Sequence, residues 1–88
     1  MKKFEINNQY ALFIIKDNFT SKEFVKKILT FIFDKSEIEA EYITKQIWIH
    51  EKAYVASYIK EIAIVKKTQV ERNAKNYGFP LKIILEEK

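Results

Sequence analysis

The chain has 88 residues, no cysteine, and 48% hydrophobic residues, so we expect one small domain that folds on an apolar core without disulfides or thiolate metal sites. Its net charge is +4, but Arg72 is the only arginine among 16 basic residues, and arginine is the residue favoured for bidentate nucleic-acid contacts. No apolar run approaches the ~18 residues of a membrane span, and residues 1–9 lack the apolar stretch of a secretory signal. We therefore expect a cytoplasmic protein without a membrane partner, and the scarcity of arginine disfavours a nucleic-acid partner. The expected organisation is a short N-terminal arm over residues 1–9 and one domain over residues 10–88.

The first predicted elements are a strand and a helix. Residues 10–16, YALFIIK, form a short, continuously apolar run, which is typical of a strand buried on both faces. Thr20 follows as a candidate N-cap, and Glu23 stands three residues later, as in a capping box. A helix over about 21–33 is predicted by apolar residues at helical spacing, which are Phe24, Val25, Ile28, Leu29 and Ile32.

A second helix and a second strand follow. Ser36 and Glu39 repeat the capping-box spacing, and Ala40, Ile43 and Ile47 share one face, which predicts a helix over 37–49. Residues 53–59, AYVASYI, are rich in aromatic and β-branched residues and predict a strand.

The last predicted elements are a long helix and a closing strand. A helix over 60–77 is indicated by Val70, Ala74 and Tyr77 on one face. Gly78 stands where a left-handed residue commonly ends a helix, and Pro80 prevents its continuation. Residues 81–87, LKIILEE, alternate in the pattern of a strand.

The predicted order of elements is β-α-α-β-α-β. Three amphipathic helices can cover one face of a small sheet, so we expect an α+β open sandwich with a three-stranded antiparallel sheet. The residues expected to be buried against the sheet or a pocket floor are Phe24, Ile28, Ile47 and Leu81.

The sequence contains no recognisable enzyme signature. His50 is the single histidine and falls near the end of the second helix, where a surface role is more common than a catalytic one. Glu37, Glu39 and Glu41 follow one another at a spacing of two residues, which points successive side chains to different faces of a helix, so favourable charge near the helix N-terminus explains them better than a metal site. We therefore expect a binding module that uses no cofactor.

Three stretches resemble the ClpS family, the adaptors of the Clp AAA+ protease. The family motif N-D-D-x-T-P-M-E-F corresponds to KDNFTSKEF, which keeps Asp17, Thr20, Glu23 and Phe24. A second motif, K-A-x-x-G-x-F/Y, is matched by Lys52, Ala53 and Tyr58, with Ala56 in place of glycine. A closing H-P-L-x-x-x-x-E is matched by Pro80, Leu81 and Glu86, with Phe79 in place of histidine.

The resemblance implies a protein that is not an enzyme. Such adaptors dock on the N-terminal domain of a Clp-family AAA+ unfoldase and deliver proteins whose N-terminal residue is a bulky hydrophobe. The family binds the α-ammonium with an Asn, an Asp and a His, whose positions are Lys16, Asp17 and Trp48 here. A two-residue shift would instead place His50 in the histidine position. The implied hydrophobic pocket consists of Thr20, Lys22, Val25, Thr44, Ile47 and Leu81.

The implied site departs from the family at its mouth. Asp17 can accept a hydrogen bond from an ammonium, whereas Lys16 has donors only and places a like charge beside it. Trp48 either offers its indole face to a cation or fills the core. The N-terminal arm is shorter than that of the family, so whether the chain delivers substrates to the unfoldase is left open. Two alternatives follow from the altered site: the chain binds N-terminal residues with a changed preference, or it docks on the unfoldase as a modulator without binding them.

The implied docking surface lies at the start of the third helix. Glu61 and Lys66 match the charged docking positions of the family, whereas Ile64 and Val65 replace a Glu and a Thr. These replacements either enlarge an exposed apolar surface or let Ile64 reach the core. A basic module that binds RNA or the ribosome on a similar sandwich is the alternative from a different class.

Overall fold

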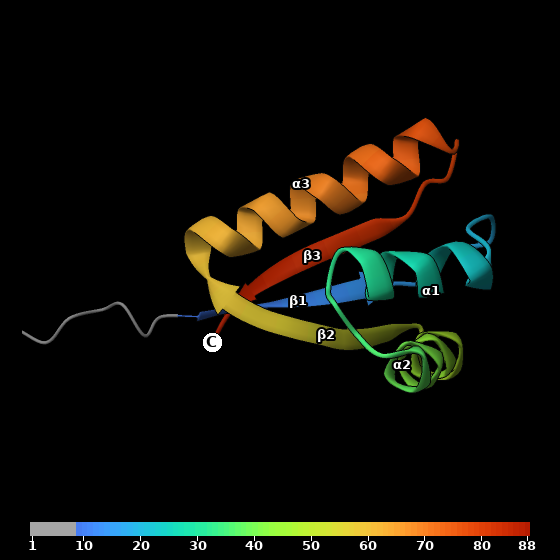
Figure 1. Ribbon diagram of the computed structural model, residues 1–88, viewed down its shortest axis with the longest axis horizontal. Coiled ribbons are helices and arrows are strands. Elements are labelled where there is room, and N and C mark those ends of the chain that lie inside the picture. Colours follow the sequence, from blue (N-terminus) through green and yellow to red (C-terminus); the bar gives the residue numbers. More distant parts are fainter. Residues whose placement is uncertain (1–8) are drawn as a thin grey trace, which may run out of the picture.

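The computed structural model describes residues 9–88 and has the predicted β-α-α-β-α-β order (Figure 1). The elements are β1 (Gln9–Ile15), α1 (Lys22–Phe31), α2 (Glu37–His50), β2 (Lys52–Ile59), α3 (Lys60–Asn76) and β3 (Lys82–Glu87). The strands form one antiparallel sheet in the order β2-β1-β3. The predicted fold class is therefore confirmed. Of the expected arm over residues 1–9, only Gln9 is described, and it begins β1; the rest lies outside the described residues.

The helices cover one face of this sheet. Helix α3 contacts all three strands, and α2 contacts β2 and α1 (Figure 1). Leu12 and Ile14 of β1 are fully buried, but Phe13 and Ile15, which alternate with them, are only half-buried. The prediction that this strand is buried on both faces was wrong, because the second face of a three-helix open sandwich has no layer against it.

Helices α1 and α2 begin with side-chain caps, one of them shifted from its predicted residue. Ser36 and Glu39 form the predicted capping box, in which the Glu39 N–H donates to Ser36 Oγ at 3.1 Å and the Ser36 N–H donates to Glu39 Oε1 at 3.0 Å. Thr20, however, is not the N-cap of α1. Ser21 has that role, since its Oγ accepts from the Phe24 N–H at 3.1 Å. The Thr20 hydroxyl is instead bound by Asp17.

Helix α3 ends as predicted at a left-handed glycine. Gly78 has a φ of 76°, a conformation that glycine adopts without strain. Its N–H donates to the Lys75 carbonyl at 3.0 Å, and the Phe79 N–H donates to the Ala74 carbonyl at 2.9 Å. This pair of bonds is a Schellman motif, and it turns the chain toward β3.

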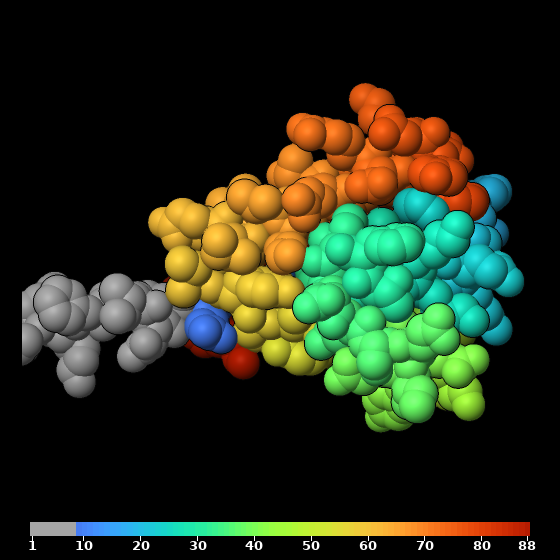
Figure 2. Space-filling model, in the orientation of Figure 1, coloured from blue at the N-terminus to red at the C-terminus, as the bar shows by residue number. Residues whose placement is uncertain are grey.

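The core lies between the helices and the covered face of the sheet. Phe24, Ile28, Ile47 and Leu81 are all buried, as predicted. Figure 2 shows that the side chains of α1 and α2 meet on the visible face, next to those of α3. Within residues 9–88, no helix has the length and apolar character that a membrane crossing requires.

Candidate functional site

The turn after β1 is built around the carboxylate of Asp17. Its Oδ1 accepts from the N–H groups of Phe19 and Thr20, each at 2.7 Å, and its Oδ2 accepts from the Thr20 hydroxyl at 2.7 Å. Three of the roughly four acceptor positions of this carboxylate are therefore used within the turn. The remaining position is on Oδ2, where a further donor can bind.

Asp17 is held in its charged form. Partial burial raises the pKa of its carboxyl group, but the hydrogen bonds from Thr20 and Phe19 and the charge of Lys16 together outweigh this effect. The net result is a pKa below the usual value, so the carboxylate is ionised at neutral pH. It is thus the ionised acceptor that binding of an ammonium requires.

The ring of Trp48 is close to the ammonium groups of two lysines. The Lys16 Nζ is 5.8 Å from the centre of the Trp48 ring, and the Lys22 Nζ is 5.6 Å from it. The Lys16 N–H donates to the carbonyl of Glu51 at 2.9 Å, which ties the turn to the end of α2. Trp48 is half-buried and packs against the core, so it fills space and also exposes part of its ring. Two ammonium groups already contact that ring.

A cavity of about 330 Å³ opens between α1 and α2 beside Trp48. Three of the predicted site residues line it, namely Lys22, Thr44 and Trp48. Sequence reasoning missed the other four lining residues, which are Lys26, Glu41, Lys45 and Ile49. Their spacing contained the signal, because Lys22 and Lys26 on α1, and Glu41 and Lys45 on α2, are four residues apart and share a helix face.

The remaining predicted pocket residues lie deeper or elsewhere. Val25 and Ile47 are fully buried, and Thr20 is buried under the Asp17 turn. Leu81 lines a different cavity, formed with Phe19 and the end of α3. The structure therefore brings Lys22, Thr44 and Trp48 together at one opening and places Leu81 at another; that all six residues form one pocket stays a prediction.

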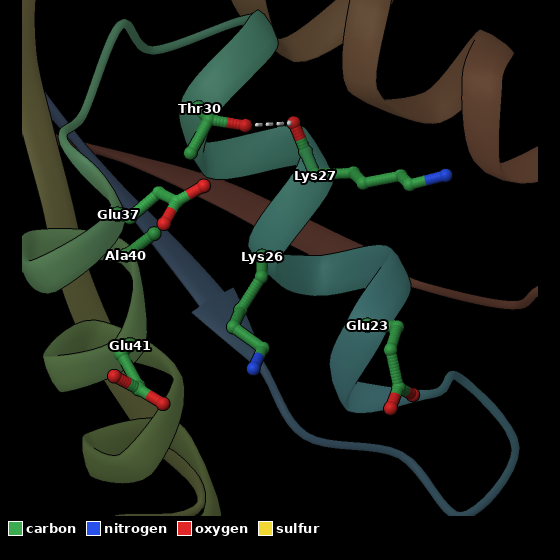
Figure 3. A pocket seen from close by; sticks show the side chains of 7 residues that line it. All are labelled: Glu23, Lys26, Lys27, Thr30, Glu37, Ala40 and Glu41. Carbon is green, nitrogen blue, oxygen red and sulfur yellow. Dashed lines mark hydrogen bonds between the residues drawn. The ribbon is translucent and has the colours of Figure 1, made fainter.

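The groove between α1 and α2 continues away from Trp48 toward the start of α2. It is lined there by residues of both charges, which are Glu23, Lys26, Lys27, Thr30, Glu37, Ala40 and Glu41. Figure 3 shows Lys26 of α1 and Glu41 of α2 in the space between the helices, and Lys27 directed away from it. Both Lys26 and Glu41 also line the cavity at Trp48, so the two hollows adjoin.

The histidine and the glutamates have ordinary surroundings. His50 is exposed in the last turn of α2 and does not line the cavity at Trp48. Glu39 is used in the capping box, which lowers the pKa of its carboxyl group. Within the described part of the chain, no three acidic or histidine side chains lie close enough together to hold a metal ion.

The start of α3 forms an exposed surface with apolar and charged residues. Ile64 and Val65 are 45% and 51% exposed, so Ile64 does not reach the core, and Ile62 is exposed beside them. Glu61 is exposed as well. Lys66 is half-buried, because its Nζ donates to the Ile32 carbonyl at 2.7 Å at the end of α1.

Comparisons with known proteins identify the family. The family model described as ATP-dependent Clp protease adaptor protein ClpS matches residues 5–84. The ATP-dependent Clp protease adapter protein ClpS of Helicobacter hepaticus is 37% identical over 78 residues, which are 89% of this chain and 79% of the relative. That of Treponema denticola is 36% identical over 86 residues, covering 98% and 85% of the two chains.

A solved structure agrees with these relatives. Agrobacterium tumefaciens ClpS2 bound to L-phenylalaninamide superposes with a TM-score of 0.88 and 26% identity, covering 92% of this chain and 98% of that chain. The chain belongs to the ClpS family of ATP-dependent Clp protease adaptor proteins.

Proposed function

We propose that this Clp protease adaptor binds proteins with a bulky hydrophobic N-terminal residue at the cavity between α1 and α2. The observation that carries this proposal is the ionised Asp17 carboxylate, which keeps one acceptor position free at the turn that leads into α1. Trp48 and Ile49 give the cavity beside α1 apolar lining for a hydrophobic side chain, and Thr44 lines it as well. The neighbouring ClpS2 structure contains an amino-acid amide with a hydrophobic side chain, which supports the same class of ligand.

We further propose that the exposed start of α3 docks on the N-terminal domain of a Clp-family AAA+ unfoldase. Ile62, Ile64 and Val65 present apolar side chains, and Glu61 adds a charge to the same surface. Exposed apolar patches with polar neighbours are typical of partner surfaces. Lys66 contributes indirectly, since its bond to the Ile32 carbonyl links α3 to the residue that ends α1. In this role the chain acts in the cytoplasm, catalyses no reaction, and delivers substrates or modulates their choice.

One observation favours docking without N-terminal recognition as a second candidate. The Lys16 ammonium lies over Trp48, at the position where the family has a histidine that binds the ligand. Lys16 brings a like charge to the ligand's own ammonium and offers no acceptor. The two candidates share the docking surface and differ only in whether peptides bind at Asp17.

Peptide binding separates the two candidates. Fluorescence anisotropy should compare a labelled peptide that begins with Phe, the same peptide with an acetylated N-terminus, and one that begins with Ala. We expect the free Phe peptide to bind at least about tenfold more tightly than the acetylated one, because acetylation removes a charge-assisted hydrogen bond. Equal binding of the free and acetylated peptides would show that Asp17 does not hold the ammonium. Absence of binding by all three peptides would favour docking alone.

A further inference from the structure

Lysines surround the opening of the cavity at Trp48. Lys22 and Lys26 line it from α1 and Lys45 lines it from α2, and we call these three residues the lysine rim. Among the described residues, the one carboxylate that lines the same cavity belongs to Glu41. The opening is therefore strongly positive.

The charges of the rim are not neutralised by ion pairs within the described residues. The salt bridges of residues 9–88 join Lys52 to Glu86 and Lys67 to Glu71, so none of them involves a rim lysine. Lys16 adds another ammonium near Lys22, because both contact the Trp48 ring. Lysines free of such pairs can move toward an anionic group when one arrives.

The rim imposes an electrostatic condition on any peptide with a free N-terminus. The ligand's ammonium must approach a cavity lined by three lysines and one glutamate. The second residue of the ligand is only about 3.3–3.6 Å of extended backbone further on, within reach of long lysine side chains. A carboxylate there cancels the charge of the ammonium and pairs with the rim, whereas a cation there adds to the repulsion.

We propose that this site selects proteins in which the hydrophobic N-terminal residue is followed by Asp or Glu. The inference rests on the proposed binding of N-terminal residues at Asp17 and names the substrate class of that site. The preference is confined to the Trp48 end of the groove. Further along, the lining residues Glu23, Glu37 and Glu41 outnumber the lining lysines Lys26 and Lys27, so the net charge there is no longer positive (Figure 3).

The test compares three peptides that begin with Phe-Glu, Phe-Ala and Phe-Lys and are otherwise identical. By anisotropy at low salt we expect Phe-Glu to bind roughly threefold to tenfold more tightly than Phe-Lys, the size expected for one or two exposed ion pairs. The ratio should shrink toward one at about 1 M salt, where the screening length is about 3 Å.

Two variants with the same charge change assign the effect to the rim. Lys45→Glu should lower the Phe-Glu to Phe-Lys affinity ratio to about one, with Lys22→Glu as a second rim variant, because each replaces a rim ammonium with a carboxylate. Lys60→Glu is the matched control and should leave the ratio unchanged. Lys60 is exposed and lies at the opposite end of the sheet from Lys16. It follows Ile59, which pairs with Gln9 at the start of β1, whereas Lys16 follows the end of β1.

Each alternative outcome is decisive. If Phe-Ala binds but Phe-Glu and Phe-Lys bind equally, the acidic preference is refuted and the proposed function stands. If the preference exists but neither rim variant changes it, its source is not the lysine rim and the inference is also refuted. If none of the three peptides binds, both the inference and the proposed reading of N-termini fail.

Discussion

The Asp17 turn and the start of α3 use their polar and apolar groups in opposite ways. At the turn, the chain itself fills three acceptor positions of the Asp17 carboxylate, and Trp48 already contacts two lysines. At the start of α3, Ile64 and Val65 are about half exposed within residues 9–88. Most hydrogen-bonding capacity of the Asp17 turn is therefore used within the chain, whereas the start of α3 has exposed apolar side chains that a partner can cover.

The two regions are therefore suited to different ligands: the Asp17 turn has a preorganised acceptor, and the start of α3 has apolar surface available for burial. A turn whose acceptor is fixed by its own backbone presents one lone pair in a defined direction, which suits a small ligand such as an ammonium. An exposed apolar helix surface gains free energy only when a larger partner removes it from water. The comparison therefore predicts weak, geometrically strict binding at Asp17 and area-driven binding at α3.

The largest expected effect is on the stability of α1, the helix that follows the Asp17 turn. Phe24 of α1 is buried, and its ring centre lies 5.0 Å from that of Phe79 and 5.3 Å from that of Tyr77. Phe24→Ala should lower the free energy of unfolding by about 3–5 kcal/mol, because it leaves a cavity between α1 and the end of α3. Urea unfolding measures this value.

Phe31→Ala is the matched control for that truncation. Phe31 is on the same helix but is 82% exposed, so its removal should change the free energy of unfolding by less than about 0.5 kcal/mol. Equal losses of unfolding free energy in the two variants would contradict the assignment of Phe24 to the buried face of α1 and Phe31 to its exposed face.

The next largest effect is expected from adding hydrogen-bond acceptors at the proposed peptide site beside Asp17. Lys16→Asn combined with Trp48→His removes the competing ammonium and adds groups that can accept a hydrogen bond. A charge-assisted bond of about 1.5–3 kcal/mol corresponds to roughly a tenfold to hundredfold gain in affinity for a Phe peptide. Anisotropy with free and acetylated peptides measures the gain, and Lys16→Asn alone should give part of it. A double variant that binds no better than the wild type would exclude Lys16 and Trp48 as the cause of weak binding.

The smallest of these effects is the contribution of the Asp17 carboxylate to stability, which can be tested by varying the pH. Because the folded-state pKa of Asp17 lies below 3.8, its ordinary value, its contribution to stability is present above that value and is lost as the pH falls through the folded-state pKa. Asp17→Asn keeps an acceptor oxygen but no charge, so it should cost about 1 kcal/mol at neutral pH.

The control for this test is the pH profile itself. The capping-box residue Glu39 also has a lowered pKa and titrates in the acid range in both proteins. The difference between wild type and Asp17→Asn therefore isolates Asp17, and it should shrink as the pH is lowered. A difference that is independent of pH would contradict a charged Asp17 in the turn.

The sequence predicted the fold well because its local signals agree with one another. Ser36 and Glu39, the apolar spacing of α1, and Gly78 before Pro80 each depend on residues close in the chain, and the structure shows the elements that they indicate. The cap of α1 was misplaced because Thr20 and Ser21 are adjacent and both are good caps. The choice between them was made by Asp17, which takes the Thr20 hydroxyl.

The site was harder to predict because it depends on how two helices face each other. Thr44 and Trp48 were predicted from the resemblance to the family. Helix periodicity places residues on faces, but that Lys26, Glu41, Lys45 and Ile49 line one cavity depends on the contact between α1 and α2. The bond from Lys66 to the Ile32 carbonyl joins residues 34 positions apart, and no local pattern indicates it.

The most direct test of the account is docking, since peptide binding serves an adaptor only if it reaches the unfoldase. Titration calorimetry of this chain with the N-terminal domain of a Clp-family AAA+ unfoldase should show saturable binding. Val65→Asp should weaken it about fivefold or more, since it places a charge in the apolar surface of α3. Ile38→Asp, the same kind of change at an exposed position of α2, should leave it unchanged. Absence of binding by the wild-type chain, or equal weakening by the two variants, would contradict the account.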